Sequence, residues 1–294
     1  MLVLAGFLLF APPMFLFGPL AALLLVSRPA TVREWVWLLG ALGWSALWLH
    51  QAGGLGAQFA RSAAVLVSGC FLALTLWRPS NRMCRTLTAT AGAAAALAVW
   101  MVGLGVRWAT LQTAVEEEME VFQTAMRRML SGADGWSEMS RQVSLMADTI
   151  SLLYPGLLAL AAIAGLRLAW AWYHRIAARP VGAPPLPFPA FAFSDQLIWG
   201  WVIGLALALV PEPSWAPVAG ANVLLIWCAL YATRGLAVIA FFGRRTPPAV
   251  LATLAMVTLV LLPFVVGGLT IVGLADTWLD FRRRLTPATG GYTR

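Results

Sequence analysis

The sequence contains no lysine and few charged residues of any kind. All twenty basic residues are arginine, and 11% of the chain is charged, against about 25% in an ordinary soluble domain. The apolar fraction is 61%, whereas soluble domains have about 45–50%. A water-soluble fold cannot bury that much apolar surface. We therefore expect lipid to be the solvent for most of this protein.

Residues that bind metals or drive nucleophilic catalysis are also scarce. The two histidines, His50 and His174, lie at opposite ends of their predicted spans, which argues against a histidine-based metal or catalytic site. The three cysteines, Cys70, Cys84 and Cys228, are scattered and odd in number, so neither a disulfide framework nor a metal cluster is predicted. The sequence also lacks a G-x-x-x-x-G-K-[ST] phosphate loop. We predict no enzyme activity, no metal and no cofactor.

The net charge of +8 and the pI near 10.6 could suggest a nucleic-acid partner. The arginines, however, lie in short loops between apolar runs, where they determine membrane topology. We therefore predict the lipid bilayer as the partner, and no nucleic acid.

Apolar runs of membrane-spanning length recur along the chain, which predicts an all-α fold. We expect a polytopic transmembrane helical bundle of about eight to nine spans. Residues 2–26 lack the basic start of a signal peptide, so we interpret them as a retained span. The last apolar region is longer than one span needs, which favours a hairpin turning near Pro263 and Gly267-Gly268. The predicted spans cover residues 2–26, 35–50, 58–77, 86–106, 152–173, 196–210 and 218–242, followed by the apolar region 247–281.

Residues 107–151 form the one extended polar segment, and they predict an amphipathic helical hairpin outside the membrane. Apolar residues recur there at three- and four-residue steps, and acidic and basic residues fill other positions. The hairpin could be a connector that covers helix ends or a lid over a cavity, and we favour the connector. The first apolar stripe consists of Leu111, Val115, Met119, Phe122, Met126 and Met129.

Charge placement predicts the orientation and the division of the chain. Arginine-bearing loops fall on alternate turns, so they should share the cytoplasmic side, with the segment 107–151 opposite. We divide the chain into an N-terminal bundle of four spans (1–106), the surface helices (107–151), a C-terminal bundle of four or five spans (152–281) and a basic cytoplasmic tail (282–294).

Polar side chains at membrane depth are the best indicators of a site, because each is costly unless paired or facing water. Trp227, Tyr231 and Arg234 are spaced four and three residues apart and share a helix face, whereas Asn222 lies on a different face. These four residues could line a pocket for an anion or an aromatic group. Alternatively, Arg234 snorkels or pairs with a carboxylate such as Asp276.

Two further patterns have structural interpretations. Gly200 and Gly204 are spaced as G-x-x-x-G, and Ala161 and Gly165 are similarly spaced, so we expect close packing within one bundle. Near the C-terminus, Asp280 could form local ion pairs with the arginines that follow it.

The C-terminal third resembles the bacterial YybS-like family of predicted membrane proteins. The resemblance rests on the segments 222–226, 231–245 and 273–284, which read NVLLI, YATRGLAVIAFFGRR and GLADTWLDFRRR, and it extends more loosely to 15–28 and 154–156.

The resemblance implies a multi-pass protein of the bacterial cytoplasmic (inner) membrane with no established activity. The family is distantly similar to the substrate-binding subunits of energy-coupling-factor transporters, which work with separate ATPase and coupling subunits. It thus implies a small-molecule-binding, transport-related subunit acting with partner proteins. The competing hypothesis is a non-transport membrane scaffold or assembly factor. A transport subunit should have a polar cavity open to the outside, and a scaffold should have a dry, fully packed bundle.

Overall fold

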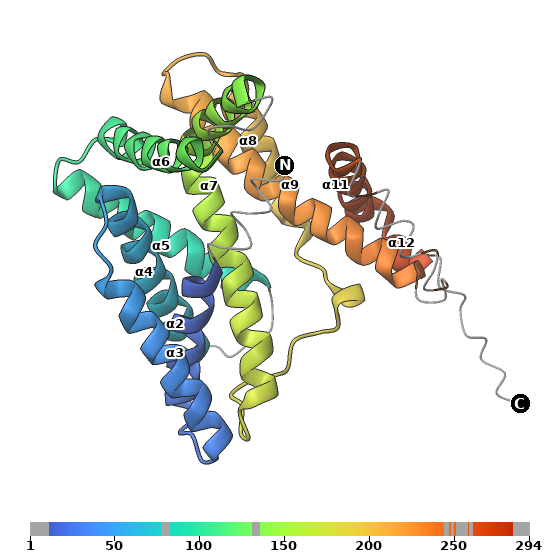
Figure 1. The fold of residues 1–294 in the computed structure, drawn as a ribbon. Helices are drawn as coiled ribbons and strands as arrows, with labels where there is room; N and C mark the ends of the chain where they lie inside the picture. Colours follow the sequence, from blue (N-terminus) through green and yellow to red (C-terminus); the bar gives the residue numbers. More distant parts are fainter. Residues whose placement is uncertain are drawn as a thin grey trace, which may run out of the picture. The chain divides into compact units, whose positions relative to one another are not determined.

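The computed structural model of the chain is helical (Figure 1). It describes residues 12–77, 83–130, 136–243, 247, 250, 258 and 261–284. Every regular element within these residues is helical, which confirms the predicted all-α class. The elements are α2 (Pro12–Val26), α3 (Val32–His50), α4 (Leu55–Trp77), α5 (Met83–Gly103), α6 (Trp108–Leu130), α7 (Trp136–Ile176), η1 (Phe188–Ala190), η2 (Asp195–Leu197), α8 (Ile198–Leu209), α9 (Trp215–Phe242), α11 (Leu262–Leu279) and α12 (Phe281–Arg284).

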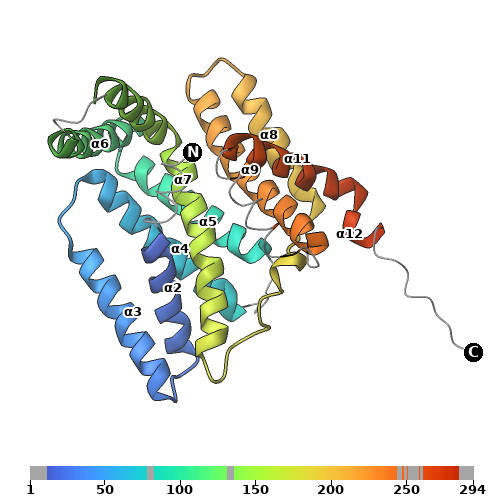
Figure 2. The same cartoon turned by 45° about the vertical axis from the view of Figure 1, so that its right-hand side comes forward.

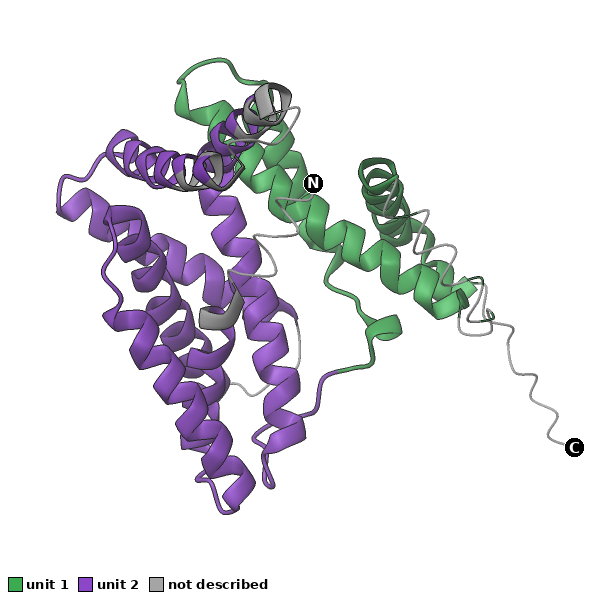
Figure 3. Cartoon of the chain, viewed as in Figure 1, with its two compact units in different colours: residues 1, 186–294 green, residues 2–185 purple. Residues whose placement is uncertain are grey.

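The helices group into two compact units, which we name the N-terminal unit (residues 2–185) and the C-terminal unit (residues 186–294) (Figure 3). The four-part division drawn from the sequence remains a prediction.

Five helices in the described part of the chain are long and apolar enough to cross a membrane. They are Leu55–Trp77, Met83–Gly103, Ser144–Ile176, Trp215–Phe242 and Leu262–Leu279. Two shorter apolar helices cover Phe15–Val26 and Asp195–Leu209. Several helices of the described part are therefore capable of crossing a membrane, and the count of eight to nine spans stays a prediction.

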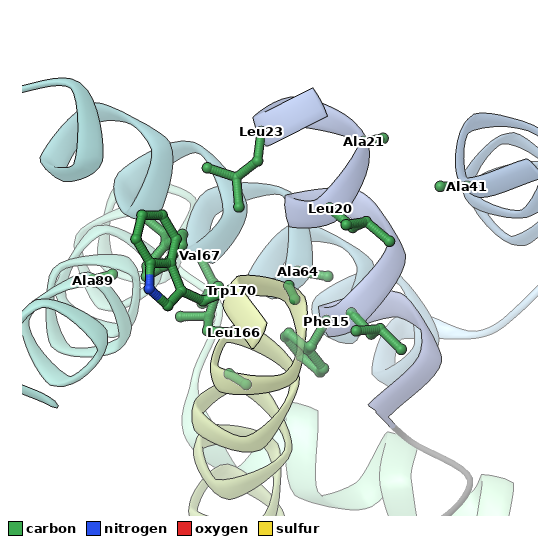
Figure 4. Close-up of a cluster of buried hydrophobic side chains, with 14 of the residues drawn as sticks. Phe15, Leu20, Ala21, Leu23, Ala41, Ala64, Val67, Ala89, Leu166 and Trp170 are labelled. Carbon is green, nitrogen blue, oxygen red and sulfur yellow. The ribbon is translucent and has the colours of Figure 1, made fainter. Parts of the chain in front are cut away.

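Helix α2 is central to the N-terminal unit and packs against α3, α4 and α7 (Figures 1 and 2). Its inner face is apolar, and Leu20 and Leu24 are fully buried. Figure 4 shows this core, in which Trp170 and Leu166 of α7 lie among side chains from α2, α4 and α5. A Cβ atom at Gly165 would overlap the backbone of Phe15, so only glycine allows α2 and α7 to approach this closely.

Helix α3 begins with a capping box that also fastens the end of α7. Thr31 Oγ1 accepts from the Glu34 N–H at 3.3 Å, and Glu34 Oε2 accepts from the Thr31 N–H at 2.8 Å. Glu34 Oε1 accepts from the Ala178 N–H at 2.7 Å. The hydrogen bonds from Ala178, Thr31 and Ala30 lower the pKa of Glu34 from 4.5 to about 2. The carboxylate therefore stays ionised near neutral pH.

Helix α6 is amphipathic, as predicted, and packs on α4 and α7. Leu111 and Val115 on its apolar face are buried. The side chains of Phe122, Met126 and Met129, also predicted for this face, lie outside the described residues. The second predicted surface helix and the fifth span are one continuous helix, α7.

Close helix crossings hold the C-terminal unit together. Gly235 of α9 faces the backbone of α11, and Gly273 of α11 faces the backbone of α9, so a Cβ atom at either position would overlap the other helix. At the contact between α8 and α9, Gly204 of α8 packs against α9, and Gly200 of α8 lies under the ring of Trp227. The prediction that Gly200 and Gly204 are close-packing residues within one bundle is confirmed.

The predicted turn at Gly267-Gly268 is wrong. Both glycines lie inside α11, which begins at Leu262 with Pro263 in its first turn. Proline is favoured at a helix start, whereas glycine inside a helix costs only about 1 kcal/mol relative to alanine, which packing can offset. The break in the last apolar region therefore falls before Pro263. The residues between 244 and 260 lie mostly outside the described part.

Candidate functional site

The C-terminal unit holds a buried arginine, Arg234, in an ion-pair network. Arg234 lies on α9, and its Nε donates to Asp276 Oδ2 of α11 at 2.9 Å. Its Nη1 donates to Asp195 Oδ1 of η2 at 3.0 Å, and its Nη2 donates to the backbone carbonyl of Asp276 at 3.2 Å. Each guanidinium nitrogen of Arg234 is therefore hydrogen-bonded within this unit.

Asp276 is the shared acceptor of the network. Its carboxylate is 0% exposed, and Oδ2 also accepts from Arg282 Nη2 at 2.9 Å. Its Oδ1 accepts from the Phe281 N–H at 3.2 Å, and Arg282 Nη1 donates onward to the Phe191 carbonyl at 2.9 Å. Two arginines and two aspartates give the network zero net charge. The network joins α9, α11 and α12 to the segment that carries η1 and η2.

The local backbone explains how Arg282 reaches Asp276. Asp280 ends α11 in the left-handed conformation, with φ 42°, and its N–H donates to the Asp276 carbonyl at 3.1 Å. The chain then starts α12 in a new direction, which lets Arg282 return to a carboxylate six residues earlier. The ion pairs found among the described residues use Asp276 and Asp195, in place of the local pairs predicted for Asp280.

The structure brings together two of the four residues predicted to line a pocket. The Tyr231 and Phe193 ring centroids are 5.1 Å apart, and Arg234 Cζ lies 5.3 Å from the centroid of the same ring. The Tyr231 hydroxyl is enclosed beside Thr277 and makes no hydrogen bond of ordinary geometry within the described residues.

The other two predicted residues are directed elsewhere. Trp227 packs over Gly200 of α8, and Asn222 Nδ2 donates to the Val218 carbonyl of its own helix at 2.9 Å. Pairing of Arg234 with Asp276, the alternative left open by the sequence, is what the structure shows. Ligand binding by Trp227, Tyr231, Arg234 and Asn222 remains a prediction.

An apolar pocket of about 260 Å³ lies within the N-terminal unit. Small residues from α4, α5 and α7 make about half of its walls, and larger apolar side chains make the rest. The Thr90 hydroxyl in the wall donates to the Thr86 carbonyl at 3.0 Å, so it is already satisfied. The lining residues are Phe15, Phe59, Ala63, Val67, Thr90, Ala93, Ala94, Leu97, Ala98, Met101, Trp108, Pro155, Leu158, Ala159 and Ala162.

Helix α6 supplies Trp108 to this pocket and is fastened to α4 beside it. Glu118 of α6 accepts from the Ala57 N–H at 3.2 Å, in the first turn of α4, where backbone N–H groups lack helical partners. A Cβ atom at Gly56 would lie 3.0 Å from the Glu118 carboxylate, so glycine gives the carboxylate room there. Tyr154 of α7 donates to the Gly56 carbonyl at 3.1 Å, which ties the three helices together.

Sequence reasoning missed this pocket, although a pattern for it exists. Ala93, Leu97 and Met101 recur at four-residue steps on α5, and α7 presents Ala159 and Ala162. Small residues at helical spacing usually indicate close packing of helices. A pocket forms instead where several such faces meet, and that depends on tertiary structure.

No group of three histidine, cysteine, aspartate or glutamate side chains suited to a metal ion occurs among the residues that the structure describes. Cys70, Cys84 and Cys228 are free thiols.

Comparison with protein families gives a match over nearly the whole chain. The model of a family described as predicted membrane protein (DUF2232) matches residues 1–277. No curated protein and no solved structure matches the chain. The match agrees with a membrane protein of uncharacterised function. The resemblance to the YybS-like family and to transporter subunits stays a prediction.

Proposed function

We infer that this chain, which belongs to the family described as predicted membrane protein (DUF2232), is a membrane subunit that binds a small, mostly apolar molecule. The observation that carries the proposal is the pocket within the N-terminal unit. Ligand pockets are concave and mostly apolar, and they often form between the helices of a bundle. At about 260 Å³, this pocket suits a compact ligand.

The chemistry of the walls selects the ligand class. Alanine, leucine, phenylalanine and methionine side chains offer dispersion contacts but no charge, and the Thr90 hydroxyl is bonded to its own helix. Apolar cavities of this kind take apolar guests and exclude water. The ligand therefore presents an apolar body to the pocket, in contrast to the polar cavity open to the outside that was expected if the chain is a transport subunit.

Helix α6 lies at one wall of this pocket. Trp108 in its first turn is part of the wall, and Leu111 and Val115 hold the helix against the bundle. The Glu118 side chain is joined to α4 by a single hydrogen bond, from the Ala57 N–H. Helix α6 then acts as a lid, which corresponds to the second of the two interpretations left open by the sequence for the segment 107–151.

A transport-related role in the bacterial inner membrane, with separate partner proteins, is the finer form of this proposal. Support for it comes from the resemblance to substrate-binding subunits, which leave ATP hydrolysis to other chains. A scaffold needs no ligand, so retention of a bound molecule distinguishes the two hypotheses.

Neighbouring alanines on α5 allow a matched test. Both Ala94 and Ala95 are exposed, but only Ala94 is among the residues that line the pocket. Small molecules extracted from purified protein would be compared by mass spectrometry for the wild type, Ala94→Phe and Ala95→Phe. We expect one compound to be present in the wild type and Ala95→Phe and depleted in Ala94→Phe. Identical extracts from all three proteins would favour the scaffold.

A further inference from the structure

A second cluster in the N-terminal unit contains buried donors without acceptors. Arg85 lies in the first turn of α5, and it is 7% exposed. Its guanidinium lies against two rings that are roughly perpendicular to each other, with Cζ 4.0 Å from the Trp170 centroid and 4.7 Å from the Phe71 centroid. Arg85 Nε and Nη1 are fully enclosed and have no hydrogen-bond partner within the described residues.

Trp170, which contacts Arg85, also has a buried donor without an acceptor. Its indole Nε1 is enclosed and has no hydrogen-bond partner in the described part of the chain. More than about nine in ten buried polar groups in proteins are hydrogen-bonded, and unpaired exceptions often mark an ion or water site. Three unpaired nitrogens on two side chains in contact indicate that an acceptor belongs there.

The surrounding charge is positive. Arg167 lies three residues before Trp170 on α7, close enough for its charge to repel that of Arg85. The first turn of α5 carries no acidic residue, and its backbone N–H groups form the positive end of the helix dipole. Glu34, a buried carboxylate of this unit, is bonded to the N–H groups of Ala30, Thr31 and Ala178. No ion pair to Arg85 occurs among the described residues.

We propose that Arg85 and the first turn of α5 bind a phosphate-type oxyanion. The Trp170 and Phe71 rings stand at 81° to each other on adjacent sides of the Arg85 guanidinium, and the Nε and Nη1 donors remain for the anion. A guanidinium edge donates two parallel hydrogen bonds to a phosphate or carboxylate group, which a lysine cannot reproduce. The site does not rest on the apolar pocket, because none of these residues lines it.

The oxyanion can come from two sources, a soluble phosphate or the headgroup of an anionic lipid. Basic residues near the cytoplasmic surface attract anionic lipids. The predicted topology places this end of α5 on that side. The two sources are separated by two probes, inorganic phosphate in detergent and nanodiscs that contain phosphatidylglycerol.

The experiment measures the midpoint of thermal unfolding. Phosphate is compared with sodium chloride at equal ionic strength, because screening alone changes stability. Phosphatidylglycerol nanodiscs are compared with phosphatidylcholine nanodiscs. The variants are Arg85→Gln and Arg175→Gln, because Arg175 is an exposed arginine of α7. We expect one probe to stabilise the wild type and Arg175→Gln and to have no effect on Arg85→Gln.

Stabilisation by phosphate identifies a soluble anion, and stabilisation by phosphatidylglycerol alone identifies a lipid headgroup. If Arg85→Gln does not fold, Arg85→Lys is used in its place, because lysine retains the charge but lacks the planar guanidinium. We expect Arg85→Lys to weaken the affinity for the stabilising probe about tenfold. The proposal is overturned if neither probe stabilises the wild type, or if Arg85→Gln or Arg85→Lys responds as the wild type does. We expect Arg85→Gln to retain the compound that is extracted from the wild type, because Arg85 does not line the apolar pocket.

Discussion

Removal of the charge of Asp276 should destabilise the C-terminal unit far more than the same change at Asp195. Both carboxylates bind Arg234, at 2.9 and 3.0 Å, but their side chains are 0% and 64% exposed. Asp276→Asn retains the shape of the side chain and leaves two arginines without their buried counter-charge. Breaking a buried pair from one side costs about 3–5 kcal/mol, whereas an exposed pair contributes about 0–1 kcal/mol.

An independent estimate gives a similar magnitude. Asp276 accepts hydrogen bonds from Arg234, Arg282 and the Phe281 N–H. Hydrogen bonds to charged groups each contribute about 1.5–3 kcal/mol, and asparagine can retain one or two of them in weaker form. We therefore expect Asp276→Asn to lose about 3 kcal/mol or more.

Chemical unfolding in detergent, followed by tryptophan fluorescence, measures both variants against the wild type. Asp195→Asn should stay within about 1 kcal/mol of the wild type. Equal and small losses for the two variants would refute the reasoning, because the enclosed network would then contribute no more than an exposed ion pair.

Three further predictions concern helix packing and pH. Val115→Asp should increase hydrogen exchange across α6, because Val115 is buried, whereas exposed Val121→Asp should not, and equal exchange would mean that α6 is not docked. Gly273→Ala should cost about 1–3 kcal/mol because its Cβ meets the backbone of α9, whereas Gly267→Ala, with open space around it, should be neutral or stabilising in thermal unfolding. The lowered pKa of Glu34 means that its stabilisation is present above pH 4.5 and is lost as pH falls toward about 2. The wild type and Glu34→Gln should therefore converge in stability at low pH, and a constant difference would contradict this assignment.

The elements of this fold could largely be predicted from local sequence, because apolar length and helical periodicity are local properties. The α6 stripe of Leu111 and Val115 is an example. The turn predicted near Pro263 and Gly267-Gly268 was placed partly on the glycines because glycine pairs often mark turns, yet Gly267 and Gly268 continue a helix. A glycine pair alone does not show whether the helix ends there or continues with an uncovered surface at the glycines.

The site was harder to predict than the fold. The sequence could suggest Asp276 as a partner for Arg234, because both are costly in lipid without a counter-charge. It could not show that Asp195 and Arg282 join them, since that depends on how η2 and α12 turn. From the sequence, Arg85 was interpreted only as one of the arginines of a cytoplasmic loop, because its aromatic neighbours Phe71 and Trp170 come from other helices.

The most direct test of the proposed function is the thermal stability of the protein with the compound recovered from its own extract. A molecule that binds only the folded state at about 100 times its Kd stabilises it by about 2.7 kcal/mol. We predict a rise in the unfolding midpoint for the wild type and Ala95→Phe and no rise for Ala94→Phe, because only Ala94 lines the pocket. An equal rise in Ala94→Phe, or no rise in the wild type, would contradict binding in the apolar pocket.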